Sequence, residues 1–382
     1  MTTGREIFFV ANEVDELGGV ARWQTQMAGL LAERGHTVTL IGIAPADTPM
    51  NLGDAPPFAT LTLYDVRPPS RWQPRRLRHR ADLLARRRES ARVRDARRAA
   101  DRLSALFRAA APGAVVIVTQ VWAMEWVALA DTAGHTVIGM SHESYAYCRQ
   151  SSRFQRGLRY YKDVDRLLTL TQEDADLWTG HGLTNVGFMP NPLPLTTDTP
   201  SPRTEKVVAS VGRLSHPKGI DMLLDAWAEA APQQPGWRLR VYGTGELEEP
   251  LKRQCAALGL DDSVEWAGQT HDVVGALRGA SVFVLSSRGE GFPLALLEAM
   301  ACGLACAAFD CAPGVREIVE DGVDGLLARP GNTSDLARQL VRLMGDVDLR
   351  DAMGELARDR VRRYSPESIT RSWEELFDLL ER

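Results

Sequence analysis

Two glutamates, Glu290 and Glu298, stand eight residues apart around the predicted start of a helix, in the stretch SSRGEGFPLALLEAMACG. Pro293 favours the first turn of that helix, because its missing N–H needs no partner there. The N–H groups of Leu294 and Ala295 then lie at the positive end of the helix, which suits an anion. A carboxylate in an apolar run needs a partner or a hydroxyl ligand, since an unpaired buried charge is costly. The pattern predicts a site for an anionic ligand that carries hydroxyl groups.

Two cations, Arg213 and Lys218, follow a predicted strand in the segment GRLSHPKG. The strand covers Lys206–Gly212 and a helix is expected to begin near Ile220, so both cations lie at the carboxyl end of a strand. Guanidinium and ammonium groups at such a place can balance the charge of a diphosphate when no metal does so. The alternative interpretation is a pair of solvated surface cations.

Weaker signals stand at other predicted strand ends. Gly18 and Gly19 follow the first strand, and paired glycines let backbone N–H groups approach a phosphate or a sugar, although a plain turn is the alternative. His142 also follows a strand, where residues of a binding cleft belong, yet a lone histidine is more often structural. Gly243 and Gly268 end two further strands. Gly243 begins an incomplete G-x-G-x-x-G motif. We therefore interpret it as part of the wall of a nucleotide-binding site and not as a dinucleotide-binding fingerprint.

The elements that must position these residues follow one pattern. Short aliphatic runs alternate with longer helical patterns, which is typical of βαβ units and parallel sheets covered by helices on both faces. The predicted fold class is α/β, with each half a doubly wound, Rossmann-like domain that binds ligands at the carboxyl ends of its strands. The expected strands are Glu6–Ala11, Thr37–Ile43, Ala114–Thr119, Thr136–Met140, Arg166–Thr171, Asn185–Met189, Lys206–Gly212, Arg238–Gly243, Ser263–Gly268, Ser281–Ser286 and Leu304–Phe309.

The length of 382 residues indicates two domains, because it exceeds what one ordinary core supports. Residues 190–202 hold five prolines in thirteen positions, which resist both helix and sheet and mark the boundary. We expect an N-terminal domain at 1–190, a hinge at 191–202 and a C-terminal domain at 203–365. Residues 366–382 have apolar side chains at helical spacing, and we expect this helix to pack back on the N-terminal domain.

The net charge of −5 conceals an uneven distribution. Arg67–Arg108 contains fifteen arginines, no lysine and four acidic residues, a net charge of +11. Part of it, with Leu77, Ala81 and Leu84 on one stripe, resembles a basic amphipathic helix that docks on anionic lipid or meets a lipid-linked or anionic acceptor. A solvated basic face is the second interpretation. Nucleic-acid binding is the third, and no recognisable reader motif supports it.

Several features argue against metal binding and export. Five cysteines, an odd number with no signal-peptide core near the N-terminus, indicate reduced thiols in the cytosol. Cys302, Cys306 and Cys311 lack the paired spacing of zinc sites, so we expect them to be buried as small apolar side chains. The tripeptides Asp163–Asp165 and Asp346–Asp348 stand away from the expected ligand-binding strand ends, so we predict no metal site.

Glu290 and Glu298 form the Glu-x7-Glu pattern of retaining glycosyltransferases of the GT-B fold, and the run EGFPLALLEAMACG resembles glycosyltransferase family 4. The resemblance is strongest from about Asn191 to Arg329 and weaker in the N-terminal half. It implies two Rossmann-like domains that face a central cleft, with the acceptor bound by the N-terminal domain and the nucleotide sugar by the C-terminal domain. It also implies transfer of a sugar from a nucleotide diphosphate donor without a metal or other cofactor.

The resemblance implies roles for the matching residues. Glu298 binds the ribose hydroxyls, Glu290 approaches the donor sugar, and His142 contacts that sugar near the reacting carbon. Arg213 and Lys218 hold the donor phosphates, in a loop similar to the family's G-R-x-x-x-x-K-G. These roles make Glu290, His142, Arg213 and Lys218 the expected catalytic residues, with no protein nucleophile among them. The residues expected to bind the donor are Gly18, Gly19, Arg213, Lys218, Gly243, Gly268, Glu290, Gly291, Phe292, Pro293, Leu294, Ala295 and Glu298.

The expected activity is transfer of a hexose or N-acetylhexosamine from a UDP-sugar, or a GDP-sugar, to a lipid-linked, cell-envelope polymer or other glycan acceptor. The expected location is the cytoplasm, with peripheral docking at the inner face of the membrane under the first interpretation of the arginine-rich segment. Nucleic acid is not an expected partner. Two alternatives stay open: a nucleotide-sugar epimerase of the same fold, which consumes donor without acceptor, and a non-catalytic protein that binds sugar nucleotides or nucleic acid.

Overall fold

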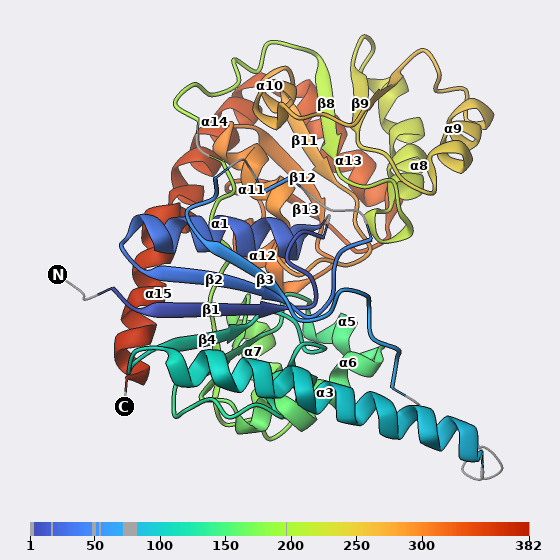
Figure 1. Cartoon of the computed structure of the whole chain (residues 1–382). Helices are drawn as coiled ribbons and strands as arrows, with labels where there is room; N and C mark the ends of the chain where they lie inside the picture. The colour runs from blue at the N-terminus through green and yellow to red at the C-terminus, as the bar shows by residue number, and fades with distance from the viewer. Residues whose placement is uncertain are drawn as a thin grey trace. The chain divides into compact units, whose positions relative to one another are not determined.

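The computed structural model describes residues 4–16, 18–47, 51–52, 55–71, 82–195 and 197–381. The chain forms two compact units, each built around one sheet (Figure 1). The first unit comprises the described residues up to Met189 together with those from Thr370 onward, and the second runs from Pro190 to Ile369. None of the described helices combines the length and the apolar character that a membrane crossing requires.

The first unit holds a seven-stranded sheet with the order β3-β2-β1-β4-β5-β6-β7. Every neighbouring pair is parallel. Central strands are aliphatic and buried, as in VVIV of β4, because helices cover the sheet. The strands are β1 (Glu6–Ala11), β2 (Thr37–Gly42), β3 (Ala59–Thr62), β4 (Val115–Val118), β5 (Thr136–Met140), β6 (Arg166–Thr169) and β7 (Val186–Phe188).

Helices follow the strands of this unit in turn. Their apolar faces join the strands in one core, in which Phe8 of β1 packs edge-on against Phe107 of α3 at a ring-centroid distance of 5.4 Å. The helices are α1 (Gly19–Glu33), α3 (Leu83–Ala109), α4 (Met124–Val127), α5 (Tyr145–Arg149), α6 (Ser152–Tyr160) and α7 (Gln172–Thr179).

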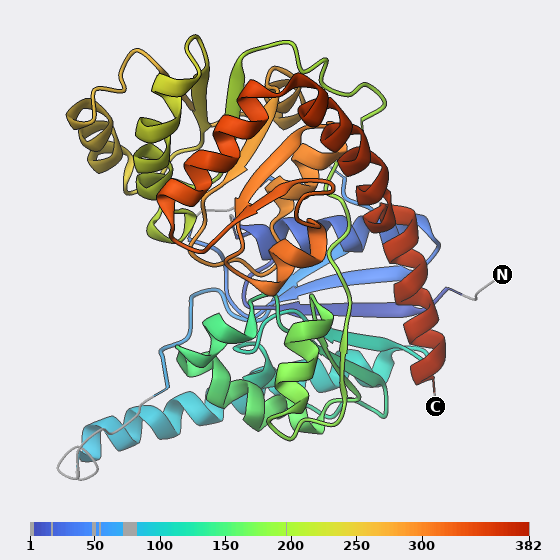
Figure 2. The ribbon, with the colours of Figure 1, turned by 180° about the vertical axis from the view of Figure 1, so that it is seen from behind.

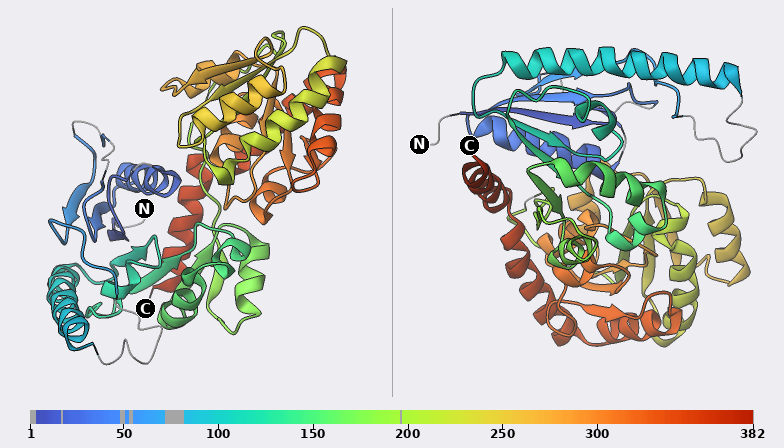
Figure 3. Two further views of the ribbon diagram at one scale, coloured as in Figure 1. Left: turned by 90° about the vertical axis from the view of Figure 1, so that its right-hand side faces the viewer. Right: turned by 90° about the horizontal axis from the view of Figure 1, so that it is seen from below.

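Only the second half of α3 contributes buried residues to the core of the first unit. Its buried residues all come from Ala96 onward, whereas the stretch 82–95 contains none. Figures 1 and 3 show α3 running beside the sheet and continuing past it. Leu84 is exposed, and Leu77 and Ala81, which the sequence placed on the same stripe, lie outside the described residues. We call residues 82–95 the basic overhang.

The helix α15 (Pro366–Leu380) completes the first unit with its residues from Thr370 onward. Trp373 and Phe377 are buried there, and Trp373 lies 6.1 Å from Trp23 of α1 between ring centroids. Arg34 donates two hydrogen bonds to Glu374, at 3.1 and 2.5 Å. The N-terminal unit is therefore built from two separate stretches of sequence.

The second unit holds a six-stranded parallel sheet with the order β10-β9-β8-β11-β12-β13. Figure 2 shows helices α13 and α14, in orange-red and red, over one face of it. The strands are β8 (Val207–Val211), β9 (Arg238–Tyr242), β10 (Val264–Gly268), β11 (Val282–Leu285), β12 (Ala305–Phe309) and β13 (Leu326–Ala328). The helices are α8 (Ile220–Ala230), α9 (Glu248–Ala257), α10 (Val273–Arg278), α11 (Leu294–Ala301), α12 (Pro313–Ile318), α13 (Thr333–Gly345) and α14 (Val347–Arg360), with short 3₁₀ turns at His216–Lys218, Ala231–Gln233 and Val361–Tyr364.

The α/β fold class with two doubly wound parallel sheets is confirmed. Two strands were not predicted, β3 (Ala59–Thr62) and β13 (Leu326–Ala328). Both lie at the edge of a sheet and have only four and three residues. An edge strand needs apolar side chains less than a central strand does, and β3 is correspondingly exposed or half-buried along its length.

Candidate functional site

The strand order of each sheet reverses once, and these reversals place the candidate residues. In the second unit the order turns between β8 and β11. Ligands of open α/β sheets bind at such a switch point, outside the carboxyl ends of the strands. The chain leaves these two strand ends as the loops 212–219 and 286–293, which hold Arg213, Lys218 and Glu290.

Close backbone contacts fix the loop 212–219. Gly219 has a left-handed backbone with φ of 63°, and a Cβ atom there would overlap the carbonyl oxygen of Ser286. Gly243 has φ of 137°, and its Cβ would overlap the carbonyl oxygen of Gly212. Glycine is therefore required at both positions, so Gly243 shapes the loop that carries the two cations.

Lys218 and Glu290, which are 72 residues apart in sequence, are in direct contact. The Lys218 Nζ donates to Glu290 Oε1 at 2.7 Å, and the Ser287 Oγ donates to the same oxygen at 2.6 Å. The Glu290 side chain is only 10% exposed. Its other oxygen, Oε2, accepts no hydrogen bond from the residues that the structure describes. The carboxylate is thus held at one oxygen and open to a ligand at the other.

Arg288 joins the two loops. Its guanidinium forms a two-pronged ion pair with Asp221 of α8, at 2.7 and 2.5 Å, and its backbone N–H donates to the Pro217 carbonyl at 2.8 Å. The Arg288 hydrogen bond lowers the pKa of the Asp221 carboxyl below its usual range. Because the carboxylate then stays ionised at neutral pH, this pair holds the two loops together independently of Lys218 and Glu290.

The start of α11 differs by one position from the prediction. The helix begins at Leu294, and Pro293 is its N-cap instead of a residue of the first turn. The Pro293 carbonyl accepts from the N–H of Leu296 at 3.1 Å. The N–H groups of Leu294 and Ala295 have no acceptor within the helix, since first-turn donors never do. They remain available at its positive end.

Glu298 and Phe292 both point into the protein. Glu298 is 1% exposed within the apolar helix α11. Phe292 is 5% exposed, with its ring 5.3 Å from the ring of Tyr364, so its side chain belongs to the packing of this unit. Of the other predicted donor residues, Arg213 is exposed at the end of β8, and Gly268 ends β10. The Gly268 carbonyl accepts from the Gly243 N–H at 2.8 Å.

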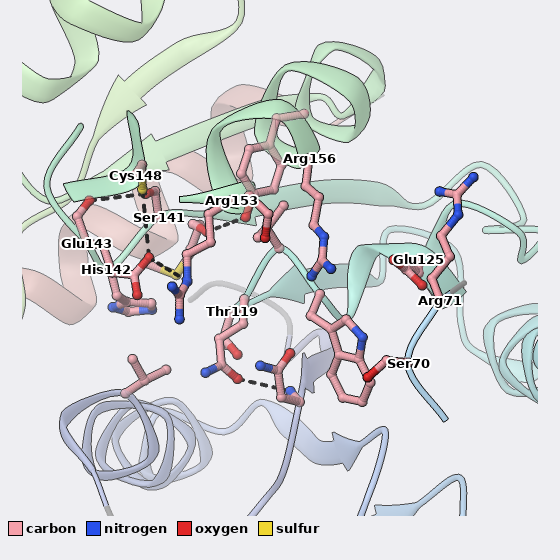
Figure 4. A pocket seen from close by; sticks show the side chains of 18 of the residues that line it. Ser70, Arg71, Thr119, Glu125, Ser141, His142, Glu143, Cys148, Arg153 and Arg156 are labelled. Atoms are coloured by element: carbon pink, nitrogen blue, oxygen red, sulfur yellow. Dashed lines mark hydrogen bonds and ion pairs between the residues drawn. The ribbon is translucent and has the colours of Figure 1, made fainter. Parts of the chain in front are cut away.

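The switch point of the first sheet lies between β1 and β4, and a cavity of about 390 Å³ opens there (Figure 4). Asn12 follows β1 and Thr119 follows β4 along its wall, and His142 follows β5. Val20 of α1 also borders it, next to Gly18 and Gly19. Of the N-terminal candidates, His142 therefore lines this cavity, whereas Gly18 and Gly19 only precede the lining residue Val20 in sequence.

His142 is neutral at physiological pH. Burial lowers the pKa of His142 to about 3. Its Nε2 is enclosed and has no hydrogen-bond partner among the described residues, and its ring packs 4.6 Å from the Trp23 ring. A neutral imidazole can exchange hydrogen bonds with a sugar hydroxyl, whereas it supplies no positive charge to a phosphate.

The two glycines at the start of α1 have free space around them. Gly18 is the N-cap and Gly19 the first helical residue, and a Cβ atom at either position would meet nothing within 4 Å. Both are exposed, so protein packing does not require glycine here. Leu17, which precedes them, lies outside the described residues.

Sequence reasoning missed several polar residues of both switch points. Ser287 and Arg288 act through loop contacts that spacing does not reveal. Arg153 and Arg156 of α6 line the cavity of the first unit. Their signal was present in the sequence, because Arg153, Arg156 and Arg159 recur every third residue in a stretch without acidic side chains.

The Asp-Val-Asp tripeptides have roles in local structure. Asp346 is the N-cap of α14 and accepts from the Leu349 N–H at 2.9 Å. Asp165 accepts from the Val137 N–H at 2.8 Å, at the start of β5. Among the described residues no three His, Cys, Asp or Glu side chains gather as a metal-binding group.

Comparison with known proteins identifies the family to which the chain belongs. The family model described as glycosyl transferases group 1 matches residues 196–360. An uncharacterized glycosyltransferase of Haemophilus influenzae is 35% identical over 236 residues, which cover 60% of this chain and 67% of that protein. An exopolysaccharide phosphotransferase of Streptomyces coelicolor is also 35% identical, over 255 residues that cover 65% of this chain and 27% of that protein. The chain thus spans about a quarter of the Streptomyces protein.

Among solved structures, HepE of Anabaena in complex with UDP is similar, with a TM-score of 0.76 at 18% identity. The likeness covers 98% of this chain and all of that chain, and at this identity it concerns the fold. The two parallel sheets, the family match and the Haemophilus relative lead to one conclusion: the chain belongs to the glycosyl transferases group 1, family 4, and has the GT-B fold.

Proposed function

We propose that the protein is a retaining, metal-independent glycosyltransferase that moves a hexose or N-acetylhexosamine from a nucleotide diphosphate sugar to a glycan acceptor. The observation that carries the proposal is the contact of Lys218 with Glu290 at the switch point of the second sheet. One cation and one carboxylate side by side suit a ligand that joins phosphates to a sugar. UDP is the preferred nucleotide, because the similar HepE structure holds UDP, and GDP is the alternative.

The proposed roles are those that the family resemblance implies, and the contacts in the second unit support them. Arg213, Lys218 and the free N–H groups of α11 stabilise the departing diphosphate, since fixed positive charge in a preorganised site acts where charge develops. Glu290 receives a hydroxyl of the donor sugar at Oε2, and Glu298 receives the ribose hydroxyls. The leaving phosphate takes the proton of the acceptor hydroxyl on the same face, so no protein nucleophile is needed.

Titration calorimetry with UDP and GDP tests the donor site. We expect Lys218→Ala to weaken UDP binding about tenfold or more, because charge-assisted hydrogen bonds contribute about 1.5–3 kcal/mol. Lys252→Ala is the matched control, since Lys252 pairs with Glu248 within α9 at 2.8 Å. Equal UDP affinity of the wild type and Lys218→Ala would contradict the assignment. Added chelator should leave binding and transfer unchanged.

Product analysis separates transfer from the rival reaction. A glycosyltransferase conserves the donor sugar's configuration at the non-reacting carbons and needs an acceptor or water to consume the donor. An epimerase of the same fold converts the donor without an acceptor. NMR of UDP-sugar incubated with the protein alone therefore distinguishes them, and accumulation of an epimeric UDP-sugar would reject the proposal.

We further propose that the acceptor is lipid-linked or a cell-envelope polymer, reached at the cytoplasmic face of a membrane. The similarity to an exopolysaccharide protein supports the acceptor class. The basic overhang supports the location, since Leu83 and Leu84 are 70% and 66% exposed at its tip. Arg86, Arg87 and Arg88 are exposed there and form no ion pair with a described residue. Basic side chains beside exposed leucines suit an anionic lipid surface.

A further inference from the structure

The cavity of the first unit is lined by four arginines that come from two parts of the chain. Arg67 and Arg71 belong to the segment after β3, and Arg153 and Arg156 to α6. Figure 4 shows Arg153 and Arg156 reaching from α6 toward Thr119, with Arg71 on the other side of the cavity. Arg67, Arg71 and Arg153 are exposed at the edge of the cavity, and Arg156 is half-buried.

Two of these arginines are already neutralised. Arg153 Nε lies 3.0 Å from Glu143 Oε2, and Arg67 is in contact with Glu13 while its guanidinium lies 5.9 Å from the centre of the Trp122 ring. Both have their charge balanced by the protein. They set the shape of the cavity more than its net charge.

The other two arginines differ from the first two in their charge balance. Neither Arg71 nor Arg156 forms an ion pair with any described residue. The remaining acid of the lining, Glu125, already has Arg92 as a neighbour at 3.7 Å. Arg156 is half-buried, so its uncompensated guanidinium is only partly in water. The positive charges of the lining side chains therefore exceed the negative ones, and a cavity with net positive charge attracts an anion.

The rest of the lining suits a sugar. Thr119, Ser141 and Ser152 offer hydroxyls, and Trp122 offers an aromatic face. His142 adds the enclosed Nε2 that has no partner among the described residues. A volume of about 390 Å³ lies within the range of small-molecule sites, about 300–1,000 Å³.

We propose that this cavity binds an acceptor glycan through an anionic substituent, a phosphate or a carboxylate, that Arg156 and Arg71 receive. Guanidinium groups pair with both oxyanions in a two-pronged geometry. The inference rests on the proposed function and gives it an acceptor class. The donor phosphates need no share in this cavity, since Arg213 and Lys218 serve them in the second unit.

Three forms of one short glucose oligosaccharide test the inference in the presence of UDP: neutral, carrying a phosphate monoester, and ending in glucuronate. Binding is measured by NMR titration. We expect wild-type protein to bind one or both anionic forms about tenfold more tightly than the neutral form. The oligosaccharide that binds more tightly shows whether the anionic group is a phosphate or a carboxylate. Equal binding of all three forms would overturn the proposal.

Variants on one helix supply the control. We expect Arg156→Gln to remove the preference for the anionic form and Arg156→Lys to restore part of it. Arg159→Gln removes the same charge from α6 and should keep the preference, since Arg159 lies over the Tyr160 ring at 5.3 Å and does not line the cavity. Preference retained in both Arg156 variants would reject the role of Arg156.

The UDP affinity of each variant separates this inference from the proposed function. If Arg156→Gln weakens UDP binding in place of anionic glycan binding, the cavity serves the donor and the inference fails. If the wild type binds neither UDP nor GDP, the proposed function fails, whatever the glycans do. Far-UV circular dichroism confirms that each variant is folded.

Discussion

One oxygen of Glu290 accepts hydrogen bonds from both Lys218 and Ser287. The negative charge and the position of this side chain are therefore set before any ligand binds. Because Lys218 is at once the partner of Glu290 and the proposed phosphate ligand, a donor that enters the site meets a cation already oriented. Preorganisation of this kind lowers the cost of aligning charges during the reaction.

Substitution of Glu290 by glutamine tests that arrangement at the residue scale. Glu290→Gln keeps the size of the side chain and removes its charge. We expect kcat to fall about 100-fold, since loss of one charged hydrogen-bonding group costs about 1.5–3 kcal/mol. Steady-state kinetics on a UDP-sugar provide the measurement. Glu265→Gln is the control, because Glu265 pairs with Arg240 at 2.8 Å on the edge strand β10, and turnover unaffected in both variants would rule out the role of Glu290.

Residue spacing predicted Lys218 and Glu290, whereas it gave no sign of Ser287 or Arg288. The first two stand in recognisable loops at strand ends. Arg288 matters because its partner Asp221 lies 67 residues away in sequence, in the first turn of α8. Such a pairing depends on the strand order β8-β11, which the sequence does not state.

The basic overhang is the first half of α3, which precedes the part of the helix that is buried in the core of the first unit. Its N-cap Asp82 accepts from the Ala85 N–H at 2.9 Å, which satisfies one of the free donors at the helix start. Arg92 forms a two-pronged pair with Glu89, which adds local support. Alanine and arginine favour helix, so the overhang can persist without a core beneath it.

Removal of charge from the overhang tests membrane docking. We expect Arg86→Gln, Arg87→Gln and Arg88→Gln together to lower the affinity for liposomes that contain anionic lipid about 100-fold, at about 1 kcal/mol per basic residue. Co-sedimentation gives the measurement. A triple variant of exposed arginines in the second unit, Arg238, Arg253 and Arg362 to glutamine, is the control. Wild-type binding that does not depend on lipid charge would refute docking.

The helix α15 is held to the first unit by a partly buried charge cluster. Hydrogen bonds from Arg34 lower the pKa of Glu374 below its usual value of 4.5, and His36 adds to this effect. Because the folded pKa is the lower one, the stabilisation is present above the unfolded pKa and is lost as pH falls through the folded pKa. We expect Glu374→Gln to reduce the free energy of unfolding by about 1–2 kcal/mol at pH 7.

Unfolding in urea at several pH values measures this effect. The difference between wild type and Glu374→Gln should shrink below pH 4.5 and vanish once Glu374 is protonated in both states. Glu375→Gln, at the next and exposed position of α15, is the matched control. A difference that stayed constant down to acid pH would show that the ion pair is not its cause.

At the scale of elements, the central strands were predicted because they are continuous aliphatic runs. β3 was missed because its sequence ATLT is partly polar, and β13 because its apolar run LLA has only three residues. The length of α3 was also missed. Its arginine-rich first half resembles a separate surface helix, and only the buried face from Ala96 onward shows that both halves are one element.

For the whole molecule, the alternation of strands and helices was enough to predict two doubly wound sheets. The donor nucleotide and the acceptor could not be predicted in the same way. They depend on which side chains line the same cavity at a switch point, as Arg71 and Arg156 do in the first unit. The family model matches residues 196–360, which lie within the second unit. Ligand preferences of the first unit therefore depend on its own side chains.

The discontinuous first unit has a consequence for synthesis on the ribosome. The second unit, Pro190–Ile369, is one continuous stretch and can fold as soon as it has emerged. The first unit is translated earlier, yet it lacks the buried rings of Trp373 and Phe377 until the last part of α15 has appeared. The domain that is translated first is therefore completed last, and until then the apolar surface beside Trp23 lacks its cover from α15.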